Sequence, residues 1–415
     1  MRVLLVADMR SPHSIGWARG LLEIGATPVV VSSRQLSTCD RAALPAEIRQ
    51  TIVREPSDAW SQARALVTTH PRALAAMRVA ARGSSWMARG TTAQNQRSRP
   101  EGTGRLELPL ELRIAHALGR EIRDAAQEYR PDLIHALRIP FEGIAMTAAN
   151  PTAPTAISLW GQDLALQASS KPRLAKAAAN ALRTIRGLHA DCQRDIELAC
   201  EWGAPRDALQ LVAAGNMGYD SAIFHPDATP QEPRTVVFCP RGPASYVNFA
   251  GFLRVADRVT RARNDVVFMA ARLEGVAVAE SIRAASRHPD RIHLSGNLSQ
   301  HEMAAIYQRS LIVASPSASD GTPNSVLEGM ACGAVPLVGD IPPLYELLHE
   351  QLPESLFDPL DEGEMEHRVL DLLDAPHAEW RLKSETAQAI ARCGWSRDVT
   401  LPRVAAWYSR LGEGG

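Results

Sequence analysis

The chain has 415 residues, of which 45% are hydrophobic and 22% charged, and a formal net charge of -1. This balance is typical of a soluble globular protein and does not favour a nucleic-acid partner. The length exceeds one typical hydrophobic core, so two domains are expected. No apolar run approaches a membrane span, and the opening run 1–8 is too short for a signal peptide. The six cysteines lack the close spacing of a metal site and suit a reducing cytoplasm.

Alternating apolar segments and amphipathic helices predict an α/β protein with parallel sheets covered on both faces. In the first half, strands are expected at residues 2–7, 27–32, 133–136 and 155–159. In the second half, strands are expected at residues 235–240, 265–270, 291–295, 311–315 and 335–338. Helices are expected at 246–260 and at 299–309, where Ser299 and Glu302 form a capping-box pattern. The two series predict two Rossmann-like domains.

Residues 72–105 differ in composition from the rest of the chain. They carry a single acid, Glu101, against arginines at positions 72, 78, 82, 89, 97, 99 and 105. Small and polar residues fill most of the stretch 83–104, which predicts a flexible insertion there. A solvated loop explains this composition. Contact with an anionic membrane surface or a phosphorylated acceptor is the alternative, and it would place the protein at the inner face of the membrane.

Glycine and proline cluster between residues 213 and 233, where the domain boundary is expected. The predicted division assigns residues 1–215 to the first domain and 216–395 to the second. The last segment, 396–415, is expected to hold a final helix at about 398–411.

Residues 319–333 predict a helix start that can bind an anion. Asp320 and Gly321 supply a turn, and Pro323 suits the first helical position because its missing N–H costs nothing there. A helix start presents unsatisfied N–H groups and partial positive charge, which favours a phosphate. The amides expected to face outward are those of Asn324, Ser325 and Val326.

Glu328 lies four residues after Asn324, on the same helix face and about one turn deeper. A carboxylate at that position can accept hydrogen bonds from a ribose diol. The turn, the amides and the acid together have the shape of a nucleotide-sugar site. An ordinary capped helix in a Rossmann-like domain is the alternative.

The acid, seven intervening residues and a Glu, followed by a small-residue helix and Gly-Ala-Val-Pro, resemble the donor-binding signature of family-4 retaining glycosyltransferases, which have the GT-B fold. Most members carry Glu at the first acid, whereas a subset with Ser-Asp-Gly-Thr-Pro-Asn-Ser carries Asp, as here. The resemblance implies that Asp320 lies near the sugar hydroxyls and that Glu328 holds the ribose. It also implies contacts to sugar and diphosphate from the segment that contains Gly321, Thr322, Asn324, Ser325 and Val326.

The same resemblance implies two cations for the diphosphate. Arg241 follows the first strand of the second series and matches the family's arginine. The usual lysine a few residues later is absent, because the only lysines are Lys171, Lys176 and Lys383. Asn248 stands in the matching stretch and can donate a hydrogen bond but carries no charge. Arg272, at the end of the next strand, is the preferred substitute cation.

One further segment resembles the donor side of the family. Gly296-Asn297-Leu298 follows the strand that ends at Ser295 and resembles the loop whose backbone reads the base. An ordinary turn at Gly296 is the alternative. The final helix at about 398–411 resembles the family's terminal helix, which crosses back onto the first domain.

The first half resembles the acceptor side of the family. The loop 9–17 resembles the Ser-Pro-His loop of many members, which implies that His13 and Gly16 lie near the acceptor or the donor phosphates. The strand 132–136 resembles the family's Asp-apolar-apolar-His strand and implies that His135 and Arg138 lie near the cleft. A histidine that serves only the fold is the alternative at both positions.

Residues 160–163 match a segment where many members carry His before the glycine. Trp160 cannot donate in the same way, although its ring could stack on a sugar face. Asp163 could hold an acceptor hydroxyl. A structural role for both is the alternative.

The resemblance implies a retaining glycosyltransferase that uses a nucleotide diphosphate-sugar as co-substrate and needs neither a metal ion nor another cofactor. UDP is preferred over GDP by family frequency alone. Epimerase or phosphorylase chemistry on the same architecture, a degenerate nucleotide-sugar-binding protein and a docking module are the alternatives. The acceptor, the sugar and the oligomeric state stay open at this point.

Overall fold

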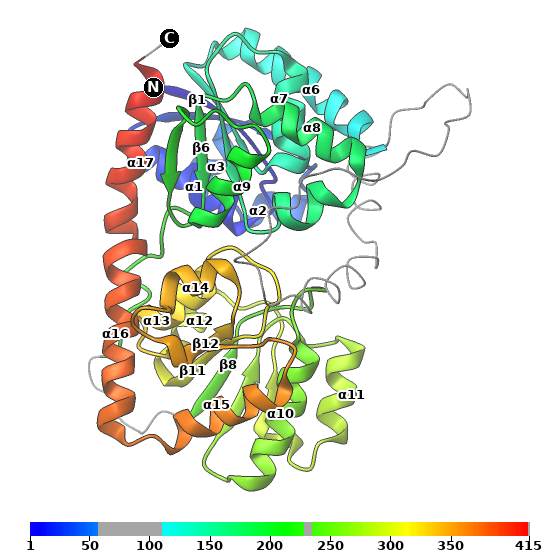
Figure 1. Ribbon diagram of the computed structural model, residues 1–415. Helices are drawn as coiled ribbons and strands as arrows, with labels where there is room; N and C mark the ends of the chain where they lie inside the picture. The colour runs from blue at the N-terminus through cyan, green and yellow to red at the C-terminus, as the bar shows by residue number, and fades with distance from the viewer. Residues whose placement is uncertain (57–109, 228–234, 414–415) are drawn as a thin grey trace, which may run out of the picture.

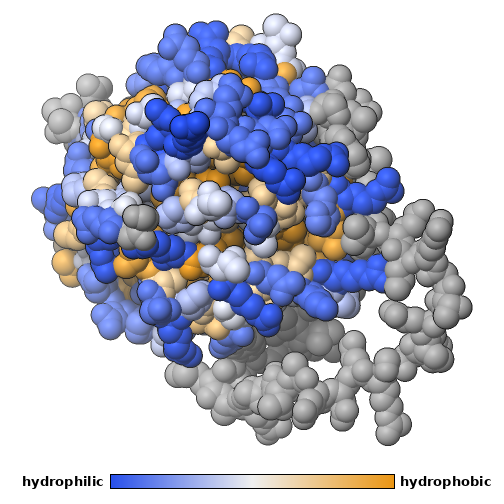
Figure 2. All heavy atoms as spheres, turned by 90° about the horizontal axis from the view of Figure 1, so that it is seen from above, coloured by the Kyte–Doolittle hydropathy of each residue, from blue (hydrophilic) through white to orange (hydrophobic). Residues whose placement is uncertain are grey.

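The computed structural model describes residues 1–56, 110–227 and 235–413, so the insertion expected at 83–104 lies outside the described residues. The chain forms two α/β domains, one stacked on the other, with both termini at the far end of the first domain (Figure 1). Seen from that end, the surface is mainly hydrophilic, with smaller hydrophobic areas between the polar residues (Figure 2). Within the described ranges, none of the helices is both long and apolar enough to cross a membrane.

The first domain is built on a seven-stranded parallel sheet with the order β3-β2-β1-β4-β5-β6-β7. Strands β1, β2, β4 and β5 lie where the sequence predicts them. Strands β3, β6 and β7 were not anticipated, because three or four residues give too short a hydrophobic pattern. The bounds are β1 Arg2–Ala7, β2 Thr27–Ser32, β3 Ile52–Arg54, β4 Leu133–Leu137, β5 Thr155–Leu159, β6 Gly187–Ala190 and β7 Leu209–Val212.

Helices cover both faces of this sheet and bury one hydrophobic cluster on each. One cluster draws its helical residues from α6 (Leu110–Tyr129), α7 (Ile144–Ala149), α8 (Pro172–Leu182) and α9 (Gln193–Glu201). The other draws them from α1 (Pro12–Glu23), α3 (Ala46–Thr51) and α17 (Arg397–Gly412). The short helix α2 (Thr38–Ala43) begins with a capping box between Ser37 and Asp40.

The second domain has a six-stranded parallel sheet with the order β10-β9-β8-β11-β12-β13. This order repeats that of the first six strands of the first domain. Five of its strands overlap the predicted positions, whereas the two-residue strand β13 was not anticipated. The bounds are β8 Val236–Cys239, β9 Val267–Ala270, β10 Ile292–Leu294, β11 Ser310–Ser315, β12 Val335–Gly339 and β13 Leu356–Phe357.

Helices also cover both faces of the second sheet. The predicted capping box at the start of α12 is confirmed, since Ser299 and Glu302 exchange hydrogen bonds with each other's backbone amides. Helix α10 begins three residues later than expected. The bounds are α10 Phe249–Ala262, α11 Ala277–Ala285, α12 Gln300–Arg309, α13 Asn324–Ala331, α14 Pro342–Leu348, α15 Glu362–Asp374 and α16 His377–Trp395.

The order of each sheet reverses at one point, between β1 and β4 in the first domain and between β8 and β11 in the second. Open parallel sheets bind ligands beyond the carboxyl ends of the strands at such a point. The residues that directly follow these four strands therefore mark the place where a site is expected.

The C-terminal helix α17 continues from the end of α16, which lies along the second domain, and runs back along the first domain (Figure 1). Trp407, Tyr408 and Leu411 of α17 lie in the same hydrophobic cluster as Trp17 of α1. The Trp407 indole N–H donates to the carbonyl of Leu209 at 2.7 Å. These contacts fasten the end of the chain to the first sheet.

A buried chain of hydrogen bonds joins α17 to strands β4, β5 and β6. The Ala213 carbonyl can only accept, so His189 Nε2 donates to it at 3.0 Å and Nδ1 accepts from the Ser158 hydroxyl at 2.8 Å. Ser158 Oγ in turn accepts from His135 Nε2 at 2.9 Å, and His135 Nδ1 accepts from the Tyr408 hydroxyl at 2.5 Å. For neutral imidazoles, this chain of bonds places the proton of each ring on Nε2.

Burial agrees with this assignment, because it lowers the pKa of His189 to about 3 and the pKa of His135 well below its usual range. His135 is fully buried and both its nitrogens are used inside the core. We therefore withdraw the prediction that His135 contacts the acceptor substrate. Its place at the carboxyl half of a strand suggested the cleft, whereas packing of α17 against β4 encloses it.

Candidate functional site

Arg241 and Asp320 meet at the point where the order of the second sheet reverses. Arg241 follows β8, and Asp320 lies in the loop after β11, the neighbouring strand. The Arg241 Nη2 group contacts the Asp320 carboxylate as an ion pair. Burial raises the pKa of Asp320, and the facing guanidinium works in the opposite direction. Arg241 Nε is buried and has no hydrogen-bond partner within the described ranges, so the guanidinium keeps a donor for another acceptor.

Helix α13 begins after the Asp320 turn with two available amides. Pro323 was expected at the first helical position but is the N-cap residue, so the helix begins one residue later, at Asn324. The Val326 amide donates to the Pro323 carbonyl at 3.0 Å, so the prediction of an outward-facing amide at this residue is wrong. In the described part of the chain, the amides of Asn324 and Ser325 make no hydrogen bond. An anion at this helix start can bind these two groups.

Glu328 lies one turn along α13. Its backbone carbonyl accepts from the Cys332 amide, whereas its carboxyl group has no hydrogen-bond partner among the described residues. Burial alone raises the pKa of its carboxyl to about 8. Beneath the helix, the hydroxyl of the buried Tyr307 donates to the carbonyl of Ser325 at 2.7 Å and fixes the helix start on the core. A half-buried acid with open acceptor positions suits a hydroxyl-rich ligand such as a ribose.

Arg272 and Gly296 are brought together at the ends of β9 and β10. Arg272 has a positive φ of 61°, and its amide donates to the carbonyl of Gly296 at 3.2 Å. Its side chain is exposed and lies beside Gly242, directly after Arg241. Asn297 is exposed, whereas Leu298 packs against the core of the second domain. The loop 296–298 therefore lies beside Arg272, and its role in reading the base stays a prediction.

Asn248 has a different role from the one expected. Its side-chain oxygen accepts from the amide of Gly251 at 3.0 Å and caps α10, while its amide donates to the carbonyl of Pro359 at 3.0 Å. Both ends of the side chain serve the fold, so Asn248 does not replace the missing lysine. The sequence predicted a helix from residue 246 and did not show that α10 begins at Phe249 with Asn248 as its cap.

His13 lies at the start of α1 and contacts helix α13 of the second domain. Its Nδ1 accepts from the side-chain amide of Asn324 at 2.9 Å. Burial lowers the pKa of His13, and the positive charges of Arg241, Arg138 and Arg272 add to this effect, so that the pKa is about 4. His13 is therefore neutral near pH 7, and three guanidinium groups converge on its surroundings.

Arg138 and Asp163 form a pair at the end of β4. Arg138 has a positive φ of 89°, and its Nε and Nη2 donate to one Asp163 oxygen at 2.9 and 2.7 Å. The other Asp163 oxygen accepts from the Trp160 amide at 3.2 Å. Asp163 is 1% exposed, so its expected contact with an acceptor hydroxyl is replaced by orientation of Arg138. The Arg138 guanidinium lies 5.6 Å from the centre of the Trp160 ring.

Trp160 and Gly16 complete the first-domain side. The Trp160 ring lies 4.9 Å from the His13 ring, and its buried indole N–H has no partner within the described ranges. Gly16 packs against the segment that joins the domains, since a Cβ there would lie 2.8 Å from the carbonyl oxygen of Asn216. Gly16 therefore serves close packing, which replaces its expected ligand contact.

The two domains also approach each other at a pair of glycines. A Cβ at Gly161 would overlap the backbone of Asp320 and Gly321, and a Cβ at Gly321 would overlap the carboxylate of Asp191. Burial raises the pKa of Asp191 well above its usual range, and the amide of Thr322 works against this as a hydrogen-bond donor. Sequence reasoning missed Asp191, because it follows β6, a strand that the hydrophobic pattern did not reveal.

One group of possible metal ligands lies close together in the described part of the chain: Asp191, Cys192 and Asp195. The guanidinium of Arg194 already lies 2.9 Å from Asp195 and 4.0 Å from the Cys192 sulfur. Since this group supplies the positive charge that the acids need, we do not assign a metal site here.

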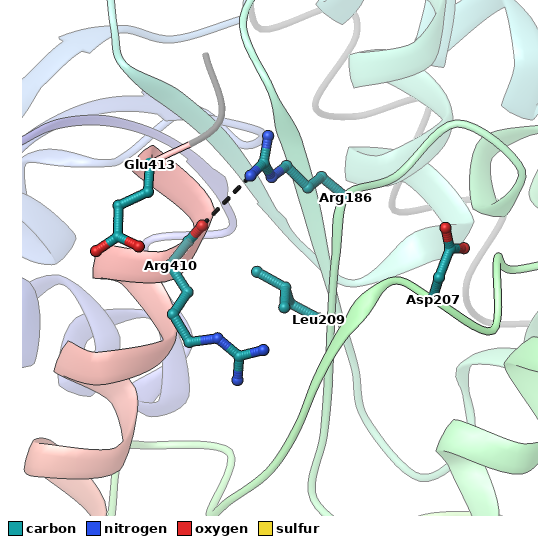
Figure 3. Close-up of a pocket in the computed structure, with 5 residues that line it drawn as sticks. All are labelled: Arg186, Asp207, Leu209, Arg410 and Glu413. Atoms are coloured by element: carbon teal, nitrogen blue, oxygen red, sulfur yellow. Dashed lines mark hydrogen bonds between the residues drawn. The ribbon is translucent and has the colours of Figure 1, made fainter.

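A surface hollow of about 520 Å³ lies far from these residues, between α17 and the edge strand β7 (Figure 3). Its lining combines two arginines with two acids and one leucine, and the Arg186 side chain donates to the carbonyl of Arg410 at 3.4 Å. The hollow includes none of the residues that follow β1, β4, β8 or β11. The lining consists of Arg186, Asp207, Leu209, Arg410 and Glu413.

Solved structures resemble the whole chain. Sucrose-phosphate synthase from Thermosynechococcus elongatus aligns over 100% of both chains at 12% identity with a TM-score of 0.70. Anabaena HepE, solved in complex with UDP, aligns over 99% of this chain and 100% of its own at 13% identity with a TM-score of 0.68. The UDP-forming trehalose-phosphate synthase from Burkholderia vietnamiensis aligns over 99% of this chain and 100% of its own at 14% identity with a TM-score of 0.65. The chain has the GT-B fold.

A family match covers most of the second domain of this GT-B protein. Residues 233–375 match the family described as Glycosyl transferases group 1, a range that contains Arg241, Asp320 and all of α13. No curated protein matches the chain. The family match and the fold together support a glycosyltransferase. The predicted fold class is confirmed, while the roles of the individual donor-side residues stay predictions.

Proposed function

We propose that this protein is a retaining glycosyltransferase that moves a sugar from a UDP-sugar to an acceptor. One observation carries the proposal: the second domain presents, next to its contacts with the first domain, the Arg241–Asp320 pair, the two available amides of α13 and the Glu328 carboxyl group. Their order matches a sugar, a diphosphate and a ribose in turn.

In the proposed reaction, the bond between the anomeric carbon and the diphosphate breaks as the acceptor hydroxyl attacks from the same face. The acceptor proton passes to a phosphate oxygen of the leaving UDP. Arg241 and the amides of Asn324 and Ser325 stabilise the negative charge that develops there by preorganised positive charge. Because this charge is supplied by protein groups, the scheme uses no metal ion.

Asp320 is proposed to bind the sugar hydroxyls. Its pairing with Arg241 uses one guanidinium nitrogen only, so Arg241 can hold Asp320 and a phosphate oxygen at the same time. The first domain closes the site with His13, Trp160 and Arg138. A cleft closed in this way excludes water, which strengthens each electrostatic contact.

The choice of UDP is supported by the structural neighbours. Anabaena HepE was solved with UDP-glucose, and the trehalose-phosphate synthase from Burkholderia vietnamiensis is named as UDP-forming. Arg272 is the proposed second cation, since it lies beside Gly242 at the end of β9. Arg138 of the first domain is the alternative second cation. Both guanidinium groups lower the pKa of His13, so both place positive charge near the same residue.

A thermal-shift panel of nucleotide diphosphates and nucleotide-sugars tests the proposal. A ligand at about 100 times its dissociation constant adds about 2.7 kcal/mol to the stability of the native state. UDP and a UDP-sugar should raise the melting temperature, and slow release of UDP from the sugar in water should show an enzyme. Stabilisation without release of UDP or transfer would favour a binding protein, and interconversion of two UDP-sugars would favour an epimerase. A preference for GDP would overturn the choice of base.

A further inference from the structure

Helix α9 of the first domain reaches the donor loop of the second. The Arg194 side chain donates from Nη2 to the carbonyl of Gly161 at 2.7 Å and to the carbonyl of Asp320 at 3.0 Å. The first bond lies within the first domain and the second crosses to the other domain. One guanidinium nitrogen has two N–H groups, so both bonds can form together.

Three features fix Arg194 in this position. Its side chain is 20% exposed, and Asp195 lies 2.9 Å from Nη2 as an ion-pair partner. The glycine at 161 allows the Asp320–Gly321 peptide to approach, since any side chain there would overlap it. The neighbouring Asp191 faces the Thr322 amide. The guanidinium therefore holds one particular peptide group and does not lie loosely on the surface.

The orientation of the Asp320–Gly321 peptide matters for the proposed reaction. The Asp320 carbonyl belongs to the same residue whose carboxylate pairs with Arg241. A rotation of this peptide would move both the carboxylate of Asp320 and the amide of Gly321, the groups that contact the sugar in the proposed function. The Asp320 carboxyl also accepts from that Gly321 amide at 3.1 Å, so the turn moves as one unit.

We propose that Arg194 is a positioning residue for the transfer reaction, which holds the Asp320–Gly321 peptide from the opposite domain when the domains are together. This inference rests on the proposed glycosyltransferase function. Arg194 acts through the backbone of Asp320 and is not itself a catalytic residue. The donor can bind to the second domain without it, but the chemical step needs it.

A second contact between the same elements provides a matched control. Glu346 of α14 accepts hydrogen bonds from the backbone amides of Gln193 and Arg194, at 3.0 and 2.9 Å, and so binds the start of α9 across the domains. This contact joins α9 to the second domain but does not touch the Asp320 turn. Glu346→Gln weakens the junction of the domains while leaving the Arg194 side chain unchanged.

The test compares Arg194→Ala, Arg194→Lys and Glu346→Gln in the full-length protein, with UDP affinity measured by calorimetry and UDP-glucose hydrolysis measured as kcat and KM. In Arg194→Ala, kcat should fall by about 10- to 100-fold, because small misplacements of reacting groups cost this much. The dissociation constant of UDP should change less than about threefold. Arg194→Lys should recover part of kcat, and Glu346→Gln should keep kcat within about threefold of the wild type.

An unchanged kcat in Arg194→Ala, or an equal loss in Glu346→Gln, would overturn the inference. Hydrogen exchange of the Gly321 and Thr322 amides in the UDP complex gives a second readout that does not depend on turnover. Exchange should accelerate in Arg194→Ala but not in Glu346→Gln, and equal exchange in all variants would again overturn it. A wild-type protein that neither binds UDP nor hydrolyses UDP-glucose would instead count against the proposed function.

Discussion

The neutral histidines in the core of the first domain predict a specific loss of stability in acid. His189 has its pKa lowered from 6.5 to about 3 in the folded protein, whereas the unfolded chain regains the ordinary value. Between pH 6.5 and about 3, His189 therefore binds a proton in the unfolded state but not in the folded state. The contribution of His189 is complete above pH 6.5 and is lost as the pH falls toward 3.

The size of the effect follows from the shift. Each pH unit between 6.5 and about 3 lowers the free energy of unfolding by about 1.4 kcal/mol. At pH 4.5, His189 therefore lowers the free energy of unfolding by about 2.7 kcal/mol relative to its value above pH 6.5. His135 acts in the same direction, since its pKa is also lowered by burial. His189→Gln keeps a donor for the Ala213 carbonyl and removes the titration.

Urea unfolding at several pH values between 8 and 4.5 measures this contribution. The variant His189→Gln should start less stable than the wild type at pH 8 and lose less stability in acid, with the two profiles converging by about 2.7 kcal/mol at pH 4.5. His301→Gln, which changes an exposed histidine on α12, controls for the loss of an imidazole elsewhere. Parallel profiles for the wild type and His189→Gln would refute the reasoning.

Three further predictions concern the second domain and the cleft. Glu328→Gln should stabilise the free protein at pH 7 by up to about 3 kcal/mol, because the buried Glu328 carboxyl, with a pKa of about 8, resists the ionisation that the unfolded chain allows. The same variant should weaken the binding of UDP more than the binding of 2′-deoxy-UDP, and equal weakening of both would exclude the ribose contact. Asn248→Ala should lower stability by about 1 kcal/mol through loss of the α10 cap, and an accompanying loss of UDP affinity in calorimetry would restore its expected phosphate role. Arg272→Ala should weaken UDP binding by about 10- to 100-fold, as loss of a charged hydrogen bond does, whereas the same loss confined to Arg138→Ala would assign the second cation to the first domain.

The fold could be predicted because its central strands carry strong local patterns. The runs at 3–7 and 335–338 are apolar on both faces and bounded by turn residues, which marks a buried parallel strand without any knowledge of its neighbours. Strand β6 is only four residues long and includes His189. Its identity as a strand depends on pairing with β5 and β7, which no local pattern shows.

The proposed donor side of the site was accessible from sequence because its residues are nearly continuous in the chain. The turn at Asp320, the start of α13 and Glu328 fall within nine residues. Partners from distant parts of the chain were not accessible. His135 is enclosed by Tyr408, which lies 273 residues later, and Arg194 reaches Asp320 across 126 residues. A strand end locates such a residue but does not reveal what packs onto it.

The most direct test of the central claim is a structure of the protein with UDP-glucose, together with a titration of Arg241→Ala. The diphosphate should lie within hydrogen-bond distance of the Asn324 and Ser325 amides and of the Arg241 guanidinium, with the ribose at Glu328. The titration should show UDP binding weakened by about 10-fold or more in the variant. A nucleotide bound elsewhere, or no binding at millimolar concentration, would contradict the account.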